Sequence, residues 1–330
     1  MSKLKKTKAL VRQKASNSKL LGVLEKGDLI EIIAPGSGAP IENLEAGAET
    51  LRRWGFKVHY HPELLKPELY LANSDEFRFE NFKQSMTNRQ SKVVWCLRGG
   101  YGAIRLLPQV EKMPVPKKKK LLIGFSDITS LHVIINQKWR WPSLHGSLID
   151  RLANEKLNNN NLEELRSSLT KSDFSNTFSA LVPLNSAAQK SKTIQSSVVG
   201  GNLLVLVSTL GTPSQIKTKN KIIFLEEIGE RGYRVDRSLQ QMKQAGLFNE
   251  ASAVVLGDFL TGAEPDGKNL VQETVVRFFK NLKIPAFSGV ETGHGQIQRP
   301  LFLGTVAILT CGVQPQMVVY SQYEIHKPRK

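Results

Sequence analysis

Apolar runs of strand length alternate with amphipathic stretches through the first 140 residues. In each amphipathic stretch the apolar residues recur every three or four positions, which is the spacing of one helix face. Glycine and proline mark the junctions, as in the APGSG turn after the first run. The alternation predicts an α/β domain, with a parallel sheet covered by helices on both faces. The predicted strands are 29–34, 56–62, 91–97 and 120–125, and the predicted helices are 41–55, 76–88, 103–110 and 128–139.

The alternation stops between residues 151 and 192 and then resumes. The interruption contains the asparagine run Asn158–Asn161 and a Ser/Lys-rich stretch, so it is predicted to be an interdomain linker. The second alternating block ends in two apolar runs, 301–312 and 315–324, which predict a closing hairpin. The chain is therefore expected to hold one α/β domain at 20–150 and another at 193–330.

Composition fits two packed domains. Of 330 residues, 40% are hydrophobic, which is normal globular usage. No run approaches the ~18 apolar residues that a membrane-spanning helix needs, and the basic N-terminus has no apolar segment of the secretory type. Cys96 and Cys311 lie in separate apolar runs and are predicted to be buried free thiols, which fits a reducing compartment. No cysteine and histidine cluster has the spacing of metal ligands, so no metal site is expected.

The net charge of +17 is partly local. Residues 1–19 carry seven basic side chains and no acid, and Lys117–Lys120 form a second basic block. A basic tail can dock on nucleic acid or anionic lipid. No aromatic residue interleaves these charges to stack on bases, so residues 1–19 are predicted to be a solvated, disordered extension. Nucleic acid is accordingly not an expected partner.

Ser126 is the first candidate for chemistry. It lies in LLIGFSDIT, where a β-rich run meets a helix. A tight strand-to-helix turn brings a side chain to the edge of the sheet and leaves the first helical N–H groups unpaired, so that they can stabilise an oxyanion. The full nucleophile-elbow pattern has a second glycine where this chain has Ile128. A serine that caps the helix is therefore an equally good interpretation of this segment alone.

A glycine-rich turn, Arg98–Gly102, follows another predicted strand. Paired glycines permit positive φ angles and a close approach of the backbone to a ligand. The turn can supply a second oxyanion donor or simply reverse the chain, and it lacks the spacing of a phosphate-binding loop.

Glu226 and His294 are the other candidates. Glu226 follows four apolar residues at a strand end, where a carboxylate is partly desolvated unless it is paired, although a surface acid is the alternative interpretation. Its neighbour Glu227 faces the opposite side of the strand. His294 lies between two glycines after a strand, whereas His132 is predicted to pack in the core.

These three groups fit together chemically. A hydroxyl, a carboxylate and an imidazole each follow a predicted strand, and ligands of α/β sheets bind beyond the carboxyl ends of the strands. The imidazole can take the serine proton while the carboxylate holds its tautomer.

The sequence resembles the LD-carboxypeptidase family of serine peptidases, the muramoyltetrapeptide carboxypeptidases. The resemblance spans residues 29–304 and rests on the segments IIAPGSG, LRGGYGAIRLLP, GFSDIT, VVGGNLLVLVSTLGTP, FLEEIGERGYRVDRSL and GHGQIQRPLFLG. It implies an N-terminal flavodoxin-like or glutamine-amidotransferase-like domain with a parallel sheet, and a C-terminal swivelling α/β domain. The site is expected between them.

By the same resemblance, Ser126 is the nucleophile, His294 the base and Glu226 the acid that orients it. The backbone N–H groups of Gly100 and Asp127 are expected to form the oxyanion hole.

The chain departs from the family pattern at three places. It has Ser147 where the family has a proline after His145 and Gly146. The basic tail and the asparagine-rich stretch have no family counterpart.

The resemblance implies cleavage of the bond between the L-centre of a diamino acid and the terminal D-alanine of a murein tetrapeptide or muropeptide. It further implies an acyl-enzyme, no cofactor, a homodimer and peptidoglycan recycling in the cytoplasm. Two alternatives stay open. One is the microcin-immunity branch of the family, which acts on peptidyl- or aminoacyl-nucleotides, and the other is a non-catalytic binding protein with a basic surface.

Overall fold

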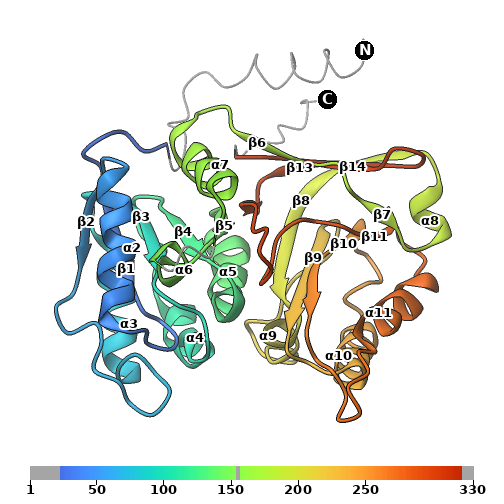
Figure 1. Cartoon of the computed structure of the whole chain (residues 1–330), viewed down its shortest axis with the longest axis horizontal. Coiled ribbons are helices and arrows are strands. Elements are labelled where there is room, and N and C mark those ends of the chain that lie inside the picture. The colour runs from blue at the N-terminus through green and yellow to red at the C-terminus, as the bar shows by residue number, and fades with distance from the viewer. Residues whose placement is uncertain (1–22, 154–156, 322–330) are drawn as a thin grey trace.

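A computed structural model describes residues 23–153 and 157–321. Two α/β halves lie side by side, with β1 to β5 in one half and β8 to β11 in the other (Figure 1). The basic tail at 1–19, predicted to be disordered, lies outside the described residues. Within the described ranges, no helix is both long and apolar enough to cross a membrane.

The first half contains a six-stranded sheet in the order β12-β5-β4-β3-β1-β2. Strands β1 to β5 are parallel, which confirms the α/β prediction. The strands are β1 (Leu29–Ile33), β2 (Lys57–Tyr60), β3 (Ser91–Cys96), β4 (Leu121–Gly124), β5 (Ser143–His145) and β12 (Leu301–Leu303), and the main helices are α2 (Ile41–Arg53), α3 (Asp75–Thr87) and α4 (Ala103–Lys112).

Helix α2 shows why the amphipathic pattern predicts these helices well. Leu44, Ala48 and Leu51 recur at helical spacing and are buried, whereas the intervening acids are exposed. Gly47 lies against Ile149 of helix α6 (Ile149–Ala153), and a Cβ there would be 2.4 Å from the Ile149 Cγ2. The glycine therefore allows the two helices to approach closely.

The helix predicted at 128–139 is more irregular than the pattern suggests. It begins as a 3₁₀ turn at Ser126–Ile128, continues as α5 (Thr129–Ile134) and widens into a π-helical turn at Ile135–Trp139. Arg140, whose φ is +56°, ends it in the left-handed region.

The second half contains an eight-stranded sheet in the order β6-β14-β13-β8-β9-β10-β11-β7. Its middle strands, β8 to β11, are parallel, and the predicted terminal hairpin is confirmed as the antiparallel pair β13–β14. The strands are β6 (Ser175–Phe178), β7 (Val182–Pro183), β8 (Lys192–Asn202), β9 (Ile222–Ile228), β10 (Ala253–Leu260), β11 (Ala286–Ser288), β13 (Val306–Cys311) and β14 (Gln316–Tyr320), and the helices are α8 (Ser186–Gln189), α9 (Leu203–Val207), α10 (Gly232–Gln244) and α11 (Val271–Lys280).

The stretch 151–192 differs from the predicted linker. It supplies helix α7 (Asn159–Thr170) and two strands, β6 and β7, of the second sheet. The asparagine run begins this helix: the Asn158 side chain accepts a hydrogen bond from the Asn161 N–H at 2.9 Å, and Asn161 is buried. Asparagine is a favoured N-cap, so a run that reads as a polar linker starts a helix instead.

Strand β12 also departs from the predicted division at residue 193. It pairs antiparallel with β5 and so adds an edge strand from the second block to the first sheet. One apolar cluster consequently joins Trp95 and Ile123 of the first sheet with Leu301 of β12 and with Phe178 and Ala307 of the second sheet. The two halves share a continuous core there. The cysteines, Cys96 and Cys311, are free and buried, as predicted.

Candidate active site

Ser126, His294 and Glu226 come from three distant segments and meet where the two halves touch. The His294 Nε2 lies 3.1 Å from the Ser126 Oγ, and the His294 Nδ1 lies 2.7 Å from the Glu226 Oε2. Ser126 follows β4, Glu226 lies in β9, and His294 lies in the loop after β11. The structure thus brings together the three side chains singled out from the sequence, in hydroxyl–imidazole–carboxylate order.

The backbone of Ser126 is in an unusual conformation. Its φ is +64°, in the left-handed region that a residue with a side chain rarely adopts. The Ser126 side chain contacts His294, and no side-chain hydrogen bond caps the 3₁₀ turn that it begins. The helix-capping interpretation of this serine is therefore wrong. Strain at one position is typical of functional turns, which project a side chain beyond the sheet.

The loops after β1, β3 and β4 pack closely around this turn. A Cβ on Gly99 would lie 3.0 Å from the Ser126 Cβ, and a Cβ on Gly36 would lie 2.6 Å from the Asp127 Oδ2. The Asp127 carboxylate accepts a hydrogen bond from the Ala103 N–H at 2.8 Å, which connects the Ser126 turn to the start of α4. Burial raises the pKa of Asp127 to about 6.

Two backbone N–H groups beside Ser126 are free to serve a ligand. Gly100 has a φ of +77°, and its N–H donates no hydrogen bond to any group of residues 23–153 and 157–321. Asp127 is the second residue of the 3₁₀ turn, so its N–H has no acceptor within that helix. Ser37, in the loop after β1, fixes the glycine turn at Arg98–Gly102, because its Oγ accepts a hydrogen bond from the Tyr101 N–H at 3.2 Å. The oxyanion-hole role of Gly100 and Asp127 stays a prediction.

The adjacent carboxylates of Glu226 and Glu227 make different contacts. Glu226 is fully buried, which rules out the surface-acid interpretation, and its Oε1 has no partner within the described parts of the chain. Glu227 accepts hydrogen bonds from the Asn202 Nδ2 at 2.9 Å, the Leu204 N–H at 2.8 Å and the Ile228 N–H at 2.9 Å. Burial raises the pKa of Glu227. Glu226 alone of the two contacts the imidazole.

Asn202, which donates to Glu227 in the second half, also contacts the first half. Its backbone N–H donates to the Thr129 Oγ1 at 2.9 Å, three residues after Ser126. Gly201, with a φ of +143°, lies so close that a Cβ there would be 2.3 Å from the Thr129 Oγ1. Helix α5, which follows the Ser126 turn, is therefore docked directly on the end of β8.

One aromatic ring packs against the imidazole of His294. The Phe125 ring lies 4.7 Å from it, centroid to centroid, and 5.6 Å from the ring of His145. His145 is buried, and burial keeps its pKa well below the ordinary value. The loop that follows holds its position without the family proline, because the Ser147 carbonyl accepts a hydrogen bond from the Trp95 Nε1 at 2.7 Å.

Residues 291–299 form a closed loop, here called the histidine loop, with His294 near its middle. The Arg299 N–H donates to the Glu291 carbonyl at 3.0 Å and closes its base. Arg151 of α6 donates to the carbonyl of Gly295 at 2.8 Å, and the Asp258 carboxylate accepts from the Gly295 N–H at 2.8 Å. Sequence reasoning missed both contacts. Asp258, like Glu226, lies near the C-terminal end of a parallel strand. That position in the sequence could have indicated that Asp258 lies at the site.

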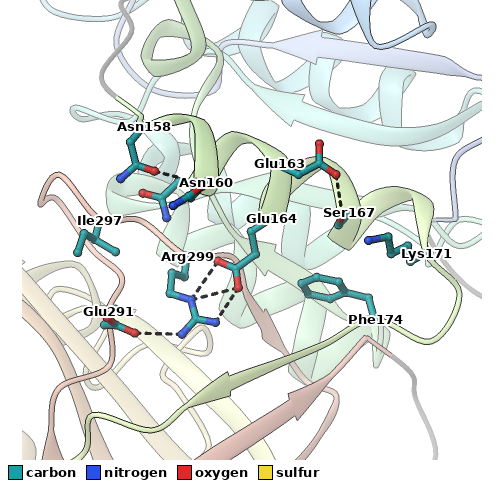
Figure 2. Close-up of a pocket in the computed structure, with 11 residues that line it drawn as sticks. Asn158, Asn160, Glu163, Glu164, Ser167, Lys171, Phe174, Glu291, Ile297 and Arg299 are labelled. Carbon is teal, nitrogen blue, oxygen red and sulfur yellow. Dashed lines mark hydrogen bonds and ion pairs between the residues drawn. The ribbon is translucent and has the colours of Figure 1, made fainter.

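The Arg299 side chain clamps the base of the histidine loop to helix α7. Its guanidinium binds both carboxylate oxygens of Glu164, with the shortest ion-pair distance 2.6 Å, and the carboxylate of Glu291 at 3.0 Å (Figure 2). It also donates to the Thr177 carbonyl at 2.9 Å and lies 4.9 Å from the centre of the Phe178 ring. Arg299, Glu164 and Glu291 line a cavity of about 650 Å³.

We expect Glu164→Gln to lower kcat by about 10- to 100-fold with a smaller change in KM, because a small displacement of a catalytic group is enough to cause such a loss. The bidentate pair is only partly exposed, unlike the exposed pair that Arg166 forms with Glu163 at 4.0 Å on the same helix. Arg166→Gln is therefore the matched control and should leave kcat unchanged. Equal kcat values for Glu164→Gln and Arg166→Gln would show that the clamp does not position His294.

His132, predicted to pack in the core, does so and makes stability depend on pH. It is fully buried behind the Ser126 turn, with its Nε2 2.8 Å from the Gly124 carbonyl, and burial lowers its pKa from 6.5 to about 4. Between these values the unfolded chain binds a proton that the folded chain refuses, so the free energy of unfolding falls as pH falls. The loss attributable to His132 should reach about 3 kcal/mol between pH 7 and pH 4.

Urea unfolding of the wild type and of His132→Gln at several pH values measures this loss. Glutamine can still donate to the Gly124 carbonyl but does not titrate, so the wild type should lose more stability than the variant as pH falls. Parallel pH profiles for the two proteins would contradict the assignment.

The fold and the paired α/β halves are those of a carboxypeptidase family. The model of the LD-carboxypeptidase N-terminal domain matches residues 30–146, and that of the LD-carboxypeptidase C-terminal domain matches residues 195–309. The chain therefore belongs to the LD-carboxypeptidase family, and it is a carboxypeptidase.

Individual relatives agree with this assignment. The chain is 38% identical over 276 residues to a Rickettsia conorii protein named as a carboxypeptidase, covering 84% of this chain and 86% of the relative. It is 27% identical over 285 residues to the murein tetrapeptide carboxypeptidase of Pseudomonas aeruginosa, covering 85% and 92%. The crystal structure of muramoyltetrapeptide carboxypeptidase from Oxalobacter formigenes superposes with a TM-score of 0.78 at 27% identity, covering 89% of this chain and 99% of that one.

Proposed function

We propose that this carboxypeptidase is a serine-type LD-carboxypeptidase that removes the terminal D-alanine from murein tetrapeptides. The observation that supports it most is the pair of contacts of His294, 3.1 Å to the Ser126 Oγ and 2.7 Å to the Glu226 Oε2. Hydroxyl, imidazole and carboxylate in this order are the parts of an acyl-transfer site. The substrate is carried over from the names of the relatives.

In the first half of the reaction, the Ser126 Oγ attacks the carbonyl carbon that precedes D-alanine, and the His294 Nε2 accepts the hydroxyl proton. Glu226 keeps the Nδ1 protonated and stabilises the imidazolium. The N–H groups of Gly100 and Asp127 receive the negative charge of the tetrahedral oxygen. When the carbon–nitrogen bond breaks, His294 returns the proton to the departing amine of D-alanine.

In the second half, water replaces the amine. His294 takes a proton from water, the resulting oxygen attacks the acyl carbon, and the ester bond to Ser126 breaks. The proton on His294 returns to the Ser126 Oγ, which leaves the tripeptide as the free acid. Each proton that His294 accepts is thus returned once, and the enzyme ends as it began.

Three finer features of the proposal come from the resemblance to the family. The protein is proposed to work in the cytoplasm, in peptidoglycan recycling, and as a homodimer. Analytical ultracentrifugation tests the last point, since a single species at the mass of one chain of 36.8 kDa would contradict it.

A substrate comparison tests the proposed activity. Purified protein is incubated with a murein tetrapeptide, with the same peptide ending in L-alanine, and with an aminoacyl-adenylate analogue that represents the nucleotide-directed branch. Free D-alanine from the first substrate alone supports the proposal. Cleavage of the nucleotide analogue without release of D-alanine would favour the microcin-immunity alternative, and no turnover of any substrate would contradict the proposal.

A further inference from the structure

A second cavity lies along the seam between the two halves, at the end of helix α5 that is farther from Ser126. It measures about 380 Å³ and is lined from the first half by Val133 of α5 and by the π-helical turn that follows, and from the second half by β8 and the segment before β9. Helix α5 and strand β8 pack against each other there (Figure 1). The cavity and Ser126 thus lie at opposite ends of one helix.

The charges that line this cavity all have one sign. Arg140, Lys217 and Lys221 are its ionisable lining residues, and no carboxylate lines it. Arg140 and the Lys217 ammonium form no ion pair with any residue in 23–153 or 157–321. Lys221 is partly buried, its Nζ donates to the Ser197 Oγ at 2.8 Å, and burial lowers its pKa. Three cations around a recess that excludes part of the solvent make a favourable place for an anion.

Four apolar side chains also line the cavity. Val133, Trp141, Val199 and Ile216 contribute buried surface. The volume falls within the range of small-molecule sites, which are mostly apolar with a few polar groups that orient the ligand. An inorganic anion would satisfy the cations and leave these side chains unused, so the lining fits an anion with an apolar body.

The two amide side chains that line the cavity already form hydrogen bonds within the protein. The Asn136 Nδ2 donates to the Trp141 carbonyl at 2.9 Å, and the Gln137 side chain bonds both the Gln215 carbonyl and the Lys217 N–H at 3.1 Å. These bonds hold the two amide side chains in place, so Arg140, Lys217 and Lys221 are the groups of the recess that can pair with an anion.

We propose that this seam cavity binds a small organic anion, a carboxylate or phosphate with an apolar group about the size of one ring. The anion pairs with Lys221 and Arg140, and the apolar group packs between Val133 and Ile216. Because residues of both halves line the site, the ligand favours the docked arrangement of the halves and raises the unfolding temperature by mass action. The site is distinct from Ser126, and the proposal does not depend on the reaction catalysed there.

Isothermal titration calorimetry of the full chain with phenyl phosphate tests this site. Phenyl phosphate should bind at least about tenfold more tightly than inorganic phosphate or phenol, because each of these supplies only half of the complementary chemistry. Lys221→Gln should weaken phenyl phosphate binding about tenfold or more, and Lys221→Arg should restore most of it. Adding Arg140→Gln to Lys221→Gln should abolish detectable binding.

Lys219→Gln is the matched control. Lys219 is exposed, pairs with Glu250 at 2.6 Å and lies two residues from Lys221, outside the cavity lining. Binding that is unchanged by Lys221→Gln, or weakened equally by Lys219→Gln, would show non-specific attraction to a protein of charge +17 and would overturn the proposal. Thermal unfolding of each variant without ligand verifies folding, and a variant that does not fold is replaced by Lys221→Met.

Discussion

Ser126→Ala should abolish release of D-alanine while leaving the fold and substrate binding nearly intact. Loss of a triad nucleophile typically lowers the rate by ~10⁴-fold or more. The expected loss is specific, because the Ser126 Oγ has the His294 Nε2 as its partner at 3.1 Å and makes no capping bond that holds the helix. Measuring kcat with a tetrapeptide and KM or Kd by calorimetry separates loss of turnover from loss of binding.

Ser208→Ala is a suitable control for this substitution. Ser208 is an exposed serine after α9, and its Oγ donates only to the Leu204 carbonyl. The control should keep full activity. If Ser126→Ala retained a tenth of the wild-type kcat in a preparation free of wild-type protein, the nucleophile would have to be another group.

Glu226→Gln should be the second most damaging substitution, with kcat lowered by about 10³- to 10⁴-fold. The side-chain oxygen of glutamine can take the place of the Glu226 Oε2 beside the His294 Nδ1. Its nitrogen then takes the place of the Oε1, which has no partner in the described structure. The geometry of the site therefore survives, and the charge that stabilises the imidazolium is lost. Comparing kcat of the variant with its urea unfolding curve tests this separation.

Glu227→Gln provides the contrast. Its carboxylate accepts three hydrogen bonds, and an amide nitrogen would face at least one of the donors, so stability should fall. Its kcat should nevertheless exceed that of Glu226→Gln by at least about a hundredfold, since Glu227 does not contact the imidazole. The reverse ranking of the two variants in kcat would transfer the role of the acid to Glu227.

The sequence predicted strands β1 to β4 of the first sheet and its helices α2 to α4 from local patterns, but not strands β5 and β12. Strand-length apolar runs and the helical spacing in α2 depend on neighbours a few residues away. Ser126 and Glu226 could be recognised because the carboxyl ends of parallel strands define one edge of each sheet. The resemblance to a family then joined these positions with His294.

The features that were missed depend on contacts between distant segments. The asparagine run reads as polar linker, and only the fold shows Asn158 capping a helix whose Glu164 grips the histidine loop. Strand β12 contains three apolar residues, too few to show which sheet they join. Arg151 and Asp258 act on the backbone around His294, and no spacing in the sequence connects them with that loop.

The most direct test of the account is to catch the acyl-enzyme. Protein and murein tetrapeptide are mixed, quenched in acid at short times and analysed by intact mass spectrometry, with free D-alanine measured in the same samples. We expect a covalent adduct with the mass of the tripeptide acyl group on Ser126, formed together with the first equivalent of D-alanine and absent in Ser126→Ala. Steady release of D-alanine by the Ser126→Ala protein, or an adduct that maps to another residue, would contradict the proposed role of Ser126.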